Sequence, residues 1–172
     1  MKDLGKIVLH IPAREGSKRV PRKNIRSMAG KPMISYVINA SIESGVTKDL
    51  YVNTDAPEII EYVHREFKEV KIYERDRELA DDKASSDQFN VDIINSLNPD
   101  TLIMINPVCP LIEASDIINS VEAFKQSDCD TLITCSTTQM QTFCECVPVN
   151  IRIDEQLAPS QDNDLVQILN WA

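Results

Sequence analysis

The stretch KIVLHIPAREGSKRVPRKNIR, residues 6–26, joins a short apolar run to the most basic segment of the chain. Residues 6–12 are rich in β-branched and other apolar side chains, which is typical of a buried β-strand. Six of the eighteen lysines and arginines follow between Arg14 and Arg26, together with Gly16. A buried strand that leads directly into a basic, glycine-containing loop predicts a ligand-binding site at the carboxyl end of that strand.

The alternation of strand and helix continues along the chain. Apolar residues at helical spacing follow each β-rich run, as in Ile34, Val37 and Ile38 after the first loop. We predict further strands at 50–54, 70–74, 101–106, 131–137 and 146–151, and helices around 32–44, 60–67, 89–97 and 117–124. Four successive strand-helix units favour an α/β fold of three layers, in which helices cover both faces of a mostly parallel sheet.

Length and charge restrict the class of protein. A chain of 172 residues with 42% apolar composition is long enough for one domain, which we expect to span residues 1–172. The net charge is -9, whereas the segment from Arg14 to Arg26 carries +5 and leaves -14 for the rest. Because the remainder is acidic and the basic segment lacks an aromatic residue on which a base would stack, we do not expect a nucleic-acid partner.

The sequence also indicates where the protein works. It contains neither a secretory signal nor an uninterrupted apolar run of about 18 residues, so we expect no membrane association. The five cysteines form an odd set without regular spacing, which favours reduced thiols. We therefore expect a cytoplasmic protein.

The basic loop has the composition of an anion-binding site. Backbone N–H groups around Gly16 and Ser17 would bind phosphate oxygens, while Arg14, Lys18 and Lys23 would supply positive charge. A triphosphate is the ligand that this arrangement suits best. The alternative is a solvated charged loop, and the pattern of a Walker-type phosphate loop is absent from the sequence.

These residues resemble a known family. IPAREGSKRVPRKN is similar to the I-P-A-R-x-G-S-K-x-x-x-x-K-N signature of the CMP-sugar acid synthetases, especially the N-acylneuraminate (sialic acid) cytidylyltransferases. Four further stretches match in order over residues 6–126, namely GKPMISYVINA, VNTDAPEI, ERDRELADDKASSDQ and NPVCPLI. The resemblance implies a Rossmann-like nucleotidyltransferase fold that uses CTP and Mg²⁺ to activate a nine-carbon sugar acid, with release of pyrophosphate.

The resemblance also implies a role for individual residues. Arg14 and Lys18 would be catalytic, and Asn106 would bind the sugar acid. Arg75 and the backbone around Ala84 would read the cytosine, although Arg75 has an alternative as a surface ion-pair partner of Glu78 or Asp82. The expected nucleotide-binding residues are Ala13, Arg14, Gly16, Ser17, Lys18, Lys23, Asn24, Arg75, Ala84 and Ser86. The metal ligands are not identified from the sequence.

Several positions depart from the family pattern. Asp76 replaces a proline, Asn106 a glutamine, Cys109 a serine and Ile112 an arginine. Beyond residue 126 the match fades, so we expect a chain that lacks the C-terminal part of the enzyme. Two alternatives stay open, a nucleotide-binding module without catalysis and a cytidylyltransferase for legionaminate or pseudaminate. A homodimer is a further expectation.

Overall fold

The computed structural model describes residues 1–16, 20–81, 83–151 and 159–169, and it divides the chain into two compact units. The first unit is Met1–Cys129 and the second is Asp130–Ala172. The expectation that residues 1–172 form one domain stays a prediction.

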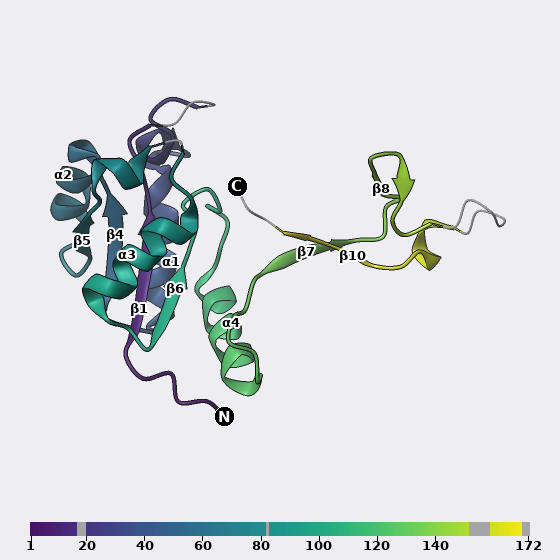
Figure 1. Cartoon of the computed structure of the whole chain (residues 1–172). Helices are drawn as coiled ribbons and strands as arrows, with labels where there is room; N and C mark the ends of the chain where they lie inside the picture. The colour runs from purple at the N-terminus through teal and green to yellow at the C-terminus, as the bar shows by residue number, and fades with distance from the viewer. Residues whose placement is uncertain (17–19, 82, 152–158, 170–172) are drawn as a thin grey trace. The chain divides into compact units, whose positions relative to one another are not determined.

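A four-stranded parallel sheet forms the centre of the first unit (Figure 1). Its strands are β1 (Ile7–Pro12), β4 (Leu50–Thr54), β5 (Lys71–Glu74) and β6 (Thr101–Met104). They lie in the order β5-β4-β1-β6, with Leu9 opposite Leu50 and Val8 opposite Leu102. The predicted parallel sheet is confirmed, and its fourth strand ends two residues earlier than expected.

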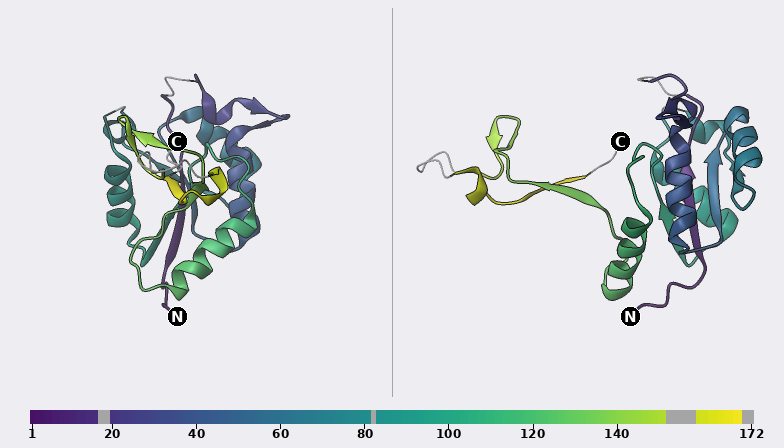
Figure 2. Two further views of the ribbon diagram at one scale, coloured as in Figure 1. Left: turned by 90° about the vertical axis from the view of Figure 1, so that its right-hand side faces the viewer. Right: turned by 180° about the vertical axis from the view of Figure 1, so that it is seen from behind.

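Helices cover both faces of this sheet. They are α1 (Met33–Ser44), α2 (Pro57–Glu66), α3 (Ser86–Leu97) and α4 (Ala114–Gln126). Viewed from the front, α3 lies before the sheet, and viewed from behind, α1 does (Figures 1 and 2). Smaller elements connect them, namely the 3-10 turns η1 (Lys23–Ile25) and η2 (Arg77–Ala80) and the short strands β2 (Ser27–Met28) and β3 (Lys31–Pro32). The three-layer α/β architecture is therefore as predicted.

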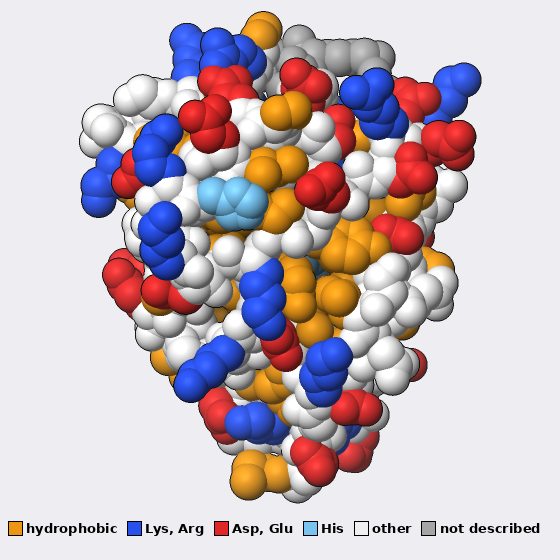
Figure 3. All heavy atoms as spheres, turned by 90° about the vertical axis from the view of Figure 1, so that its left-hand side faces the viewer, with side chains coloured by type: hydrophobic (Ala, Val, Ile, Leu, Met, Phe, Trp, Pro, Cys, Tyr) orange, Lys and Arg blue, Asp and Glu red, His pale blue; other side chains and the backbone are white. Residues whose placement is uncertain are grey.

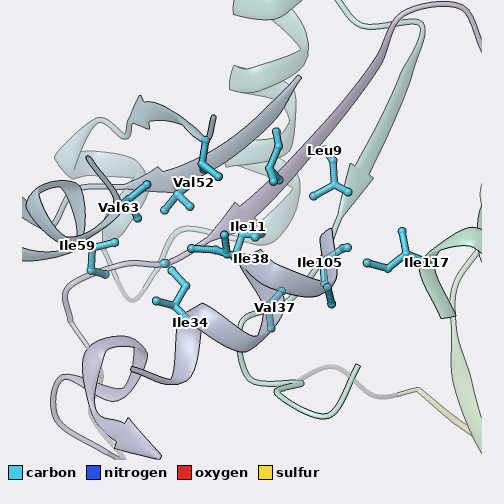
Figure 4. Close-up of a cluster of buried hydrophobic side chains, with 14 of the residues drawn as sticks. Leu9, Ile11, Ile34, Val37, Ile38, Val52, Ile59, Val63, Ile105 and Ile117 are labelled. Carbon is cyan, nitrogen blue, oxygen red and sulfur yellow. The ribbon is translucent and has the colours of Figure 1, made fainter. Parts of the chain in front are cut away.

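Side chains alternate along β1 and assign the two faces of the sheet. Leu9 and Ile11 belong to the buried apolar cluster, which includes Ile38 of α1 and Val63 of α2 (Figure 4). His10, between them in sequence, points to the opposite face and contacts α3. The face of the sheet under α1 and α2 is thus apolar, whereas the face under α3 holds buried polar groups. Buried polar groups are typical of a ligand-recognition site and not of a simple apolar core.

Local signals explain where the helices begin and end. Ser85 accepts a hydrogen bond from the Gln88 N–H, and the Gln88 side chain accepts one from the Ser85 N–H, so a capping box starts α3. Gly45, with φ of 61°, ends α1 as predicted. In α2 the buried side chain is Ile59 instead of the expected Ile60, and Phe67 lies just after the helix.

The second unit contains short antiparallel pairs instead of the two predicted strands. β7 (Cys135–Thr138) pairs with β10 (Val166–Leu169), and β8 (Phe143–Cys144) pairs with β9 (Val147–Pro148), while η3 spans Ser160–Asp162. The predicted strands at 131–137 and 146–151 are wrong in their bounds. Glu145 and Cys146 have φ of 49° and 67°, so they form the two-residue turn of a hairpin, where a strand cannot continue.

Among the residues described, no helix combines the length and apolar character needed to cross a bilayer.

Candidate functional site

The carboxyl ends of β1, β4 and β5 are tied together by hydrogen bonds beyond the strands themselves. The Ala13 N–H donates to the Asn53 carbonyl over 2.8 Å, and Thr54 Oγ1 donates to the Ala13 carbonyl over 2.5 Å. The Arg75 N–H donates to the Thr54 carbonyl over 2.9 Å. Ala13 is fully buried, so the basic loop begins from a fixed point on the edge of the sheet.

The basic loop is held at its base by two side chains. Asn24 Nδ2 donates to the Arg14 carbonyl over 3.2 Å, and the Glu15 N–H donates to Asp55 Oδ1 over 2.9 Å. Asn24 is buried, and its Oδ1 has no hydrogen-bond partner among the described residues. A buried acceptor left in this state is costly unless a ligand donates to it. Predicted residues Ser17 and Lys18 lie outside the described part of the chain.

Positive charge from two elements meets near this loop. Arg14 Nη1 donates to the carbonyl of Ala80, at the end of η2, over 3.4 Å. Arg14 also interacts electrostatically with Arg75, the residue that follows β5. In Figure 3, Lys and Arg side chains lie at the upper end of the face shown and also farther down it, interspersed with Asp and Glu side chains. Two arginines from distant parts of the sequence therefore share one end of the sheet.

Arg75 is held rigidly inside the protein. Its Nε donates to Asn53 Oδ1 over 2.7 Å, and its Nη2 donates to the Asn53 carbonyl over 3.0 Å. The guanidinium carbon lies 4.4 Å from the centroid of the Phe89 ring on α3. Only 6% of Arg75 is exposed. The alternative of a surface ion pair with Glu78 is therefore wrong, because the side chain points into the protein; Asp82 lies outside the described residues.

The buried Arg75 keeps its positive charge although burial lowers its pKa. The pKa of Arg75 is lowered to about 10, first because burial disfavours the charged form. Asp55 raises this pKa, Arg14 lowers it, and Asp92 raises it. The guanidinium thus stays protonated at neutral pH, and it presents a fixed positive charge at the carboxyl end of β5.

A buried histidine lies on the same polar face of the sheet. His10 Nε2 and Asn90 Oδ1 are 2.9 Å apart, and the His10 ring meets the Phe89 ring edge to face, with centroids 6.2 Å apart. The pKa of His10 is lowered to about 4, chiefly by burial; the hydrogen bond to Asn90 raises it and the charge of Arg75 lowers it. The ring is therefore neutral at neutral pH, and Nε2 is then the nitrogen that donates to Asn90.

The remaining predicted residues lie on the surrounding elements. Ser86 is the first residue of α3, one helical turn before Phe89, and Ala84 precedes it with its N–H donating to the Asp81 carbonyl over 3.1 Å. Lys23 begins η1. Asn106 follows β6, where its Oδ1 accepts a hydrogen bond from the Val108 N–H over 3.3 Å. Gly16 is exposed, and a side chain there would meet open space.

Several residues of this site were not apparent from the sequence. Asn53, Asp55, Phe89 and His10 were not predicted, although Asn53 and His10 are polar residues within otherwise apolar strands. That interruption was the available signal, because a polar side chain in a buried strand needs a specific partner. The partners come from α3 and from the end of β5, which no local pattern reveals.

Two other features were tested against the site. Among the described residues, no three His, Cys, Asp or Glu side chains come close enough to hold a metal ion. A hollow of about 350 Å³ lies between α1 and the start of α4, but Glu43 and Glu113 line it. Such a lining repels a carboxylate, so this hollow does not suit an acidic substrate.

Comparison with known proteins agrees with this geometry. The model of the cytidylyltransferase family matches residues 8–166, so the chain belongs to the cytidylyltransferase family. The pseudaminic acid cytidylyltransferase of Campylobacter jejuni is 38% identical over 122 residues, which make up 68% of this chain and 52% of that protein. The N-acylneuraminate cytidylyltransferase of Streptococcus agalactiae is 32% identical over 135 residues, or 75% of this chain and 32% of that protein.

A solved structure supports the fold as well. CMP:2-keto-3-deoxy-manno-octonic acid synthetase in complex with CTP matches with a TM-score of 0.62 at 25% identity, over 77% of this chain and 52% of that one. The resemblance stated from the sequence and the Rossmann-like nucleotidyltransferase fold are thereby confirmed. The chain spans about half, or less, of the length of these relatives.

Proposed function

We propose that this chain binds CTP at the carboxyl ends of β1, β4 and β5 and serves a cytidylyltransferase that activates a nine-carbon sugar acid of the N-acylneuraminate type. The observation that carries the proposal is that the Asn53 carbonyl accepts hydrogen bonds both from the Ala13 N–H, where the basic loop with Arg14 begins, and from Nη2 of the buried Arg75 at the end of β5. One arginine suits phosphate oxygens and the other suits a base. The names of the relatives, which include pseudaminic acid and N-acylneuraminate cytidylyltransferases, support the same reaction.

The reaction balances as a phosphoryl-group substitution. The anomeric oxygen of the sugar acid forms a bond to the α-phosphorus of CTP, the bond from that phosphorus to the bridging oxygen of the β-phosphate breaks, and pyrophosphate leaves. The hydroxyl proton passes to a base or to water. Arg14, Lys18 and Lys23 would neutralise the triphosphate, and positive charges that orient it lower the barrier by positioning and charge stabilisation. Asn106 would hydrogen-bond the sugar acid, while Ala84 and Ser86 would contact the nucleoside.

Magnesium fits this site only through shared ligands. The cation usually takes one or two carboxylates together with phosphate oxygens and water. Asp55 is the carboxylate that is hydrogen-bonded to the basic loop, and only its Oδ1 is used for that bond. We propose that Mg²⁺ is bound mainly by the triphosphate, with Asp55 as the contribution of the described residues; when bound it would neutralise charge on the phosphates.

Thermal unfolding with nucleotides tests the binding half of this proposal. At about 100 times its dissociation constant, CTP should stabilise the chain by roughly 2.7 kcal/mol, and ATP, GTP and UTP should stabilise it less. Equal shifts for all four nucleotides would contradict the assignment of a cytidine site.

Release of pyrophosphate tests the catalytic half. The chain is incubated with CTP, Mg²⁺ and one sugar acid at a time, with N-acetylneuraminate, legionaminate and pseudaminate as the panel. The 38% identity to a pseudaminic acid enzyme favours pseudaminate as the second candidate substrate. A CTP-specific thermal shift without pyrophosphate release from any of the three would identify a nucleotide-binding module instead.

We also propose that the protein is a cytoplasmic homodimer. The second unit exposes large apolar side chains: Met140, Phe143, Val147, Val149, Leu165, Ile168 and Leu169. Two-stranded ribbons of this kind are marginal alone, so a second copy is the partner that would cover them. Light scattering should give twice the mass of the chain, and Phe143→Asp with Leu165→Asp should halve it. The five cysteines, none of which is disulfide-bonded, suit a reducing compartment.

A further inference from the structure

We propose that Asn53 and Phe89 are positioning residues that aim the free end of the Arg75 guanidinium at a pyrimidine base, and that this arrangement lets the site distinguish cytosine from uracil. The inference rests on the proposed function, because it needs a nucleotide in the site. It assigns to two residues of unassigned role the task of setting base specificity.

Two N–H groups of Arg75 already donate hydrogen bonds within the protein. A guanidinium carries five N–H donors in a fixed plane. Asn53 takes one from Nε and one from Nη2. Among the described residues nothing accepts from Nη1. The edge of the guanidinium formed by Nε and Nη2 is therefore engaged. Three donors, two on Nη1 and one on Nη2, stay available for a ligand.

The Arg75 guanidinium lies over the Phe89 ring. Phe89 covers one face at 4.4 Å, which is a stacking distance, and its own ring is held edge-on by His10. Since the plane is fixed by Phe89 and the rotation within the plane by Asn53, the direction of the free donors is determined before a ligand arrives. Such pre-organisation raises affinity because little side-chain entropy is lost on binding.

Arg75 is buried without a direct carboxylate partner among the described residues. A buried charge that is not closely paired is costly, and it persists where function requires it. Asp55 and Asp92 act on Arg75 only through the field, and Arg14 opposes them. Holding β5 against β4 would not need a charge, because a neutral side chain would pack there at lower cost. The charge is thus retained for a ligand.

Cytosine and uracil differ in the hydrogen-bonding groups that they present to Arg75. The neighbouring O2 and N3 atoms of cytosine both accept hydrogen bonds, so they match two parallel N–H donors. Uracil places an N–H at position 3, which would face a donor. A site that offers only donors rejects the base that presents one, because the buried groups are then left unpaired.

The experiment compares CTP and UTP affinities by calorimetry on the 172-residue chain with Mg²⁺. In the wild type, CTP should bind at least about tenfold more tightly than UTP, as expected where a hydrogen bond to a charged group is lost. Asn53→Ser withdraws the acceptor from Nε, because the serine hydroxyl lies one bond closer to the backbone than Oδ1, and Phe89→Leu removes the stacked ring while keeping an apolar side chain. Both should bring the CTP to UTP ratio close to one, while triphosphate binding persists.

Two further variants complete the test. Asn53→Asp keeps an acceptor for Nε and should therefore retain the ratio of CTP to UTP affinity. The new negative charge repels both triphosphates equally, so this repulsion does not change the ratio. Tyr73→Phe on the same face of the sheet removes hydrogen bonds to Asp92 and Ser96 and should also leave the ratio unchanged. If Asn53→Ser does not fold, as judged by circular dichroism, Phe89→Leu and Asn53→Asp carry the comparison.

The outcomes separate the two proposals. A wild-type chain that binds CTP and UTP equally overturns the proposed cytidine site and this inference together. A wild-type preference for CTP that survives in Phe89→Leu and Asn53→Ser leaves the proposed function standing and overturns the positioning role alone. Loss of the ratio in Tyr73→Phe would equally contradict a specific role for Asn53 and Phe89.

Discussion

Asn24 Nδ2 donates a hydrogen bond to the carbonyl oxygen of Arg14 over 3.2 Å, and this bond joins the two ends of the basic loop. The partners are ten positions apart in sequence, so the side chain closes the loop much as a backbone bond closes a turn. The Asn24 side chain lies within the protein, and its Oδ1 is left as a buried acceptor. The asparagine of the K-N motif therefore has a structural task besides the nucleotide contact expected from the resemblance.

Replacement of Asn24 tests this closure. Asn24→Ala should cost only about 1 kcal/mol of unfolding free energy, because the lost bond is offset by removal of an unpaired buried oxygen. The affinity for CTP should nevertheless fall roughly tenfold, since the loop is no longer held in its binding conformation. Urea unfolding and calorimetry measure the two quantities. Asn39→Ala on α1, which lies outside the loop, serves as the control and should leave CTP affinity unchanged.

His10 should make the stability depend on pH. Its folded pKa of about 4 lies below the usual 6.5, so the unfolded chain binds the proton more tightly. His10 therefore does not change the free energy of unfolding above about pH 7, and it lowers that free energy as the pH falls from 6.5 to 4. The loss from this group should reach about 3 kcal/mol at pH 4 and below.

The carboxylates also titrate in this range, so the effect of His10 is measured as a difference. His10→Gln keeps a donor for Asn90 and cannot take up a proton. The unfolding free energy of the wild type minus that of the variant should decrease between pH 6.5 and 4 and stay level from pH 7 to 8. A difference that does not change with pH would show that the buried histidine is protonated equally in both states.

The architecture of the first unit was predictable because its signals are local. Ile34, Val37 and Ile38 recur at helical spacing, Gly45 provides a left-handed stop, and apolar runs mark the buried strands. The location of the site followed from the topology, since loops at the carboxyl ends of parallel strands meet at one edge.

The contacts that define the site could not be predicted in the same way. Arg75 donates to Asn53, which lies 22 positions earlier, and it stacks on the ring of Phe89, which belongs to α3. The local sequence supported only the alternative of an exposed ion pair for Arg75, since acidic residues follow it closely. The strand bounds of the second unit failed for a related reason, because β7 and β9 extend only as far as they pair with β10 and β8. The positive φ values at Glu145 and Cys146 place both residues in a hairpin turn, so Cys146 cannot begin a strand.

The charge of the basic loop should appear in salt dependence. Lys23→Ala should weaken CTP binding several-fold and flatten its dependence on ionic strength, because one fewer cation attracts the triphosphate. Titrations at low and high salt measure both effects. Lys71→Ala, whose ammonium pairs with Asp49 at the surface, should change neither. If Lys23→Ala and the wild type show the same affinity and salt dependence, the loop is merely solvated at this position.

The first unit should survive cleavage from the second. All buried apolar side chains of the described residues lie between Leu4 and Val121, so residues after 129 add none to this core. Residues 130–134 are exposed and belong to neither helix nor strand, and they include the apolar Leu132 and Ile133. A protease that cuts beside exposed leucine and isoleucine, such as thermolysin, should therefore cleave there first.

The resulting fragment of about 130 residues should unfold cooperatively and keep its preferential stabilisation by CTP, because Arg14, Asn24, Asn53 and Arg75 all remain. Circular dichroism and thermal shifts on the purified fragment measure both properties. A fragment that is unfolded, or folded without a response to CTP, would place part of the core or of the nucleotide site in the second unit.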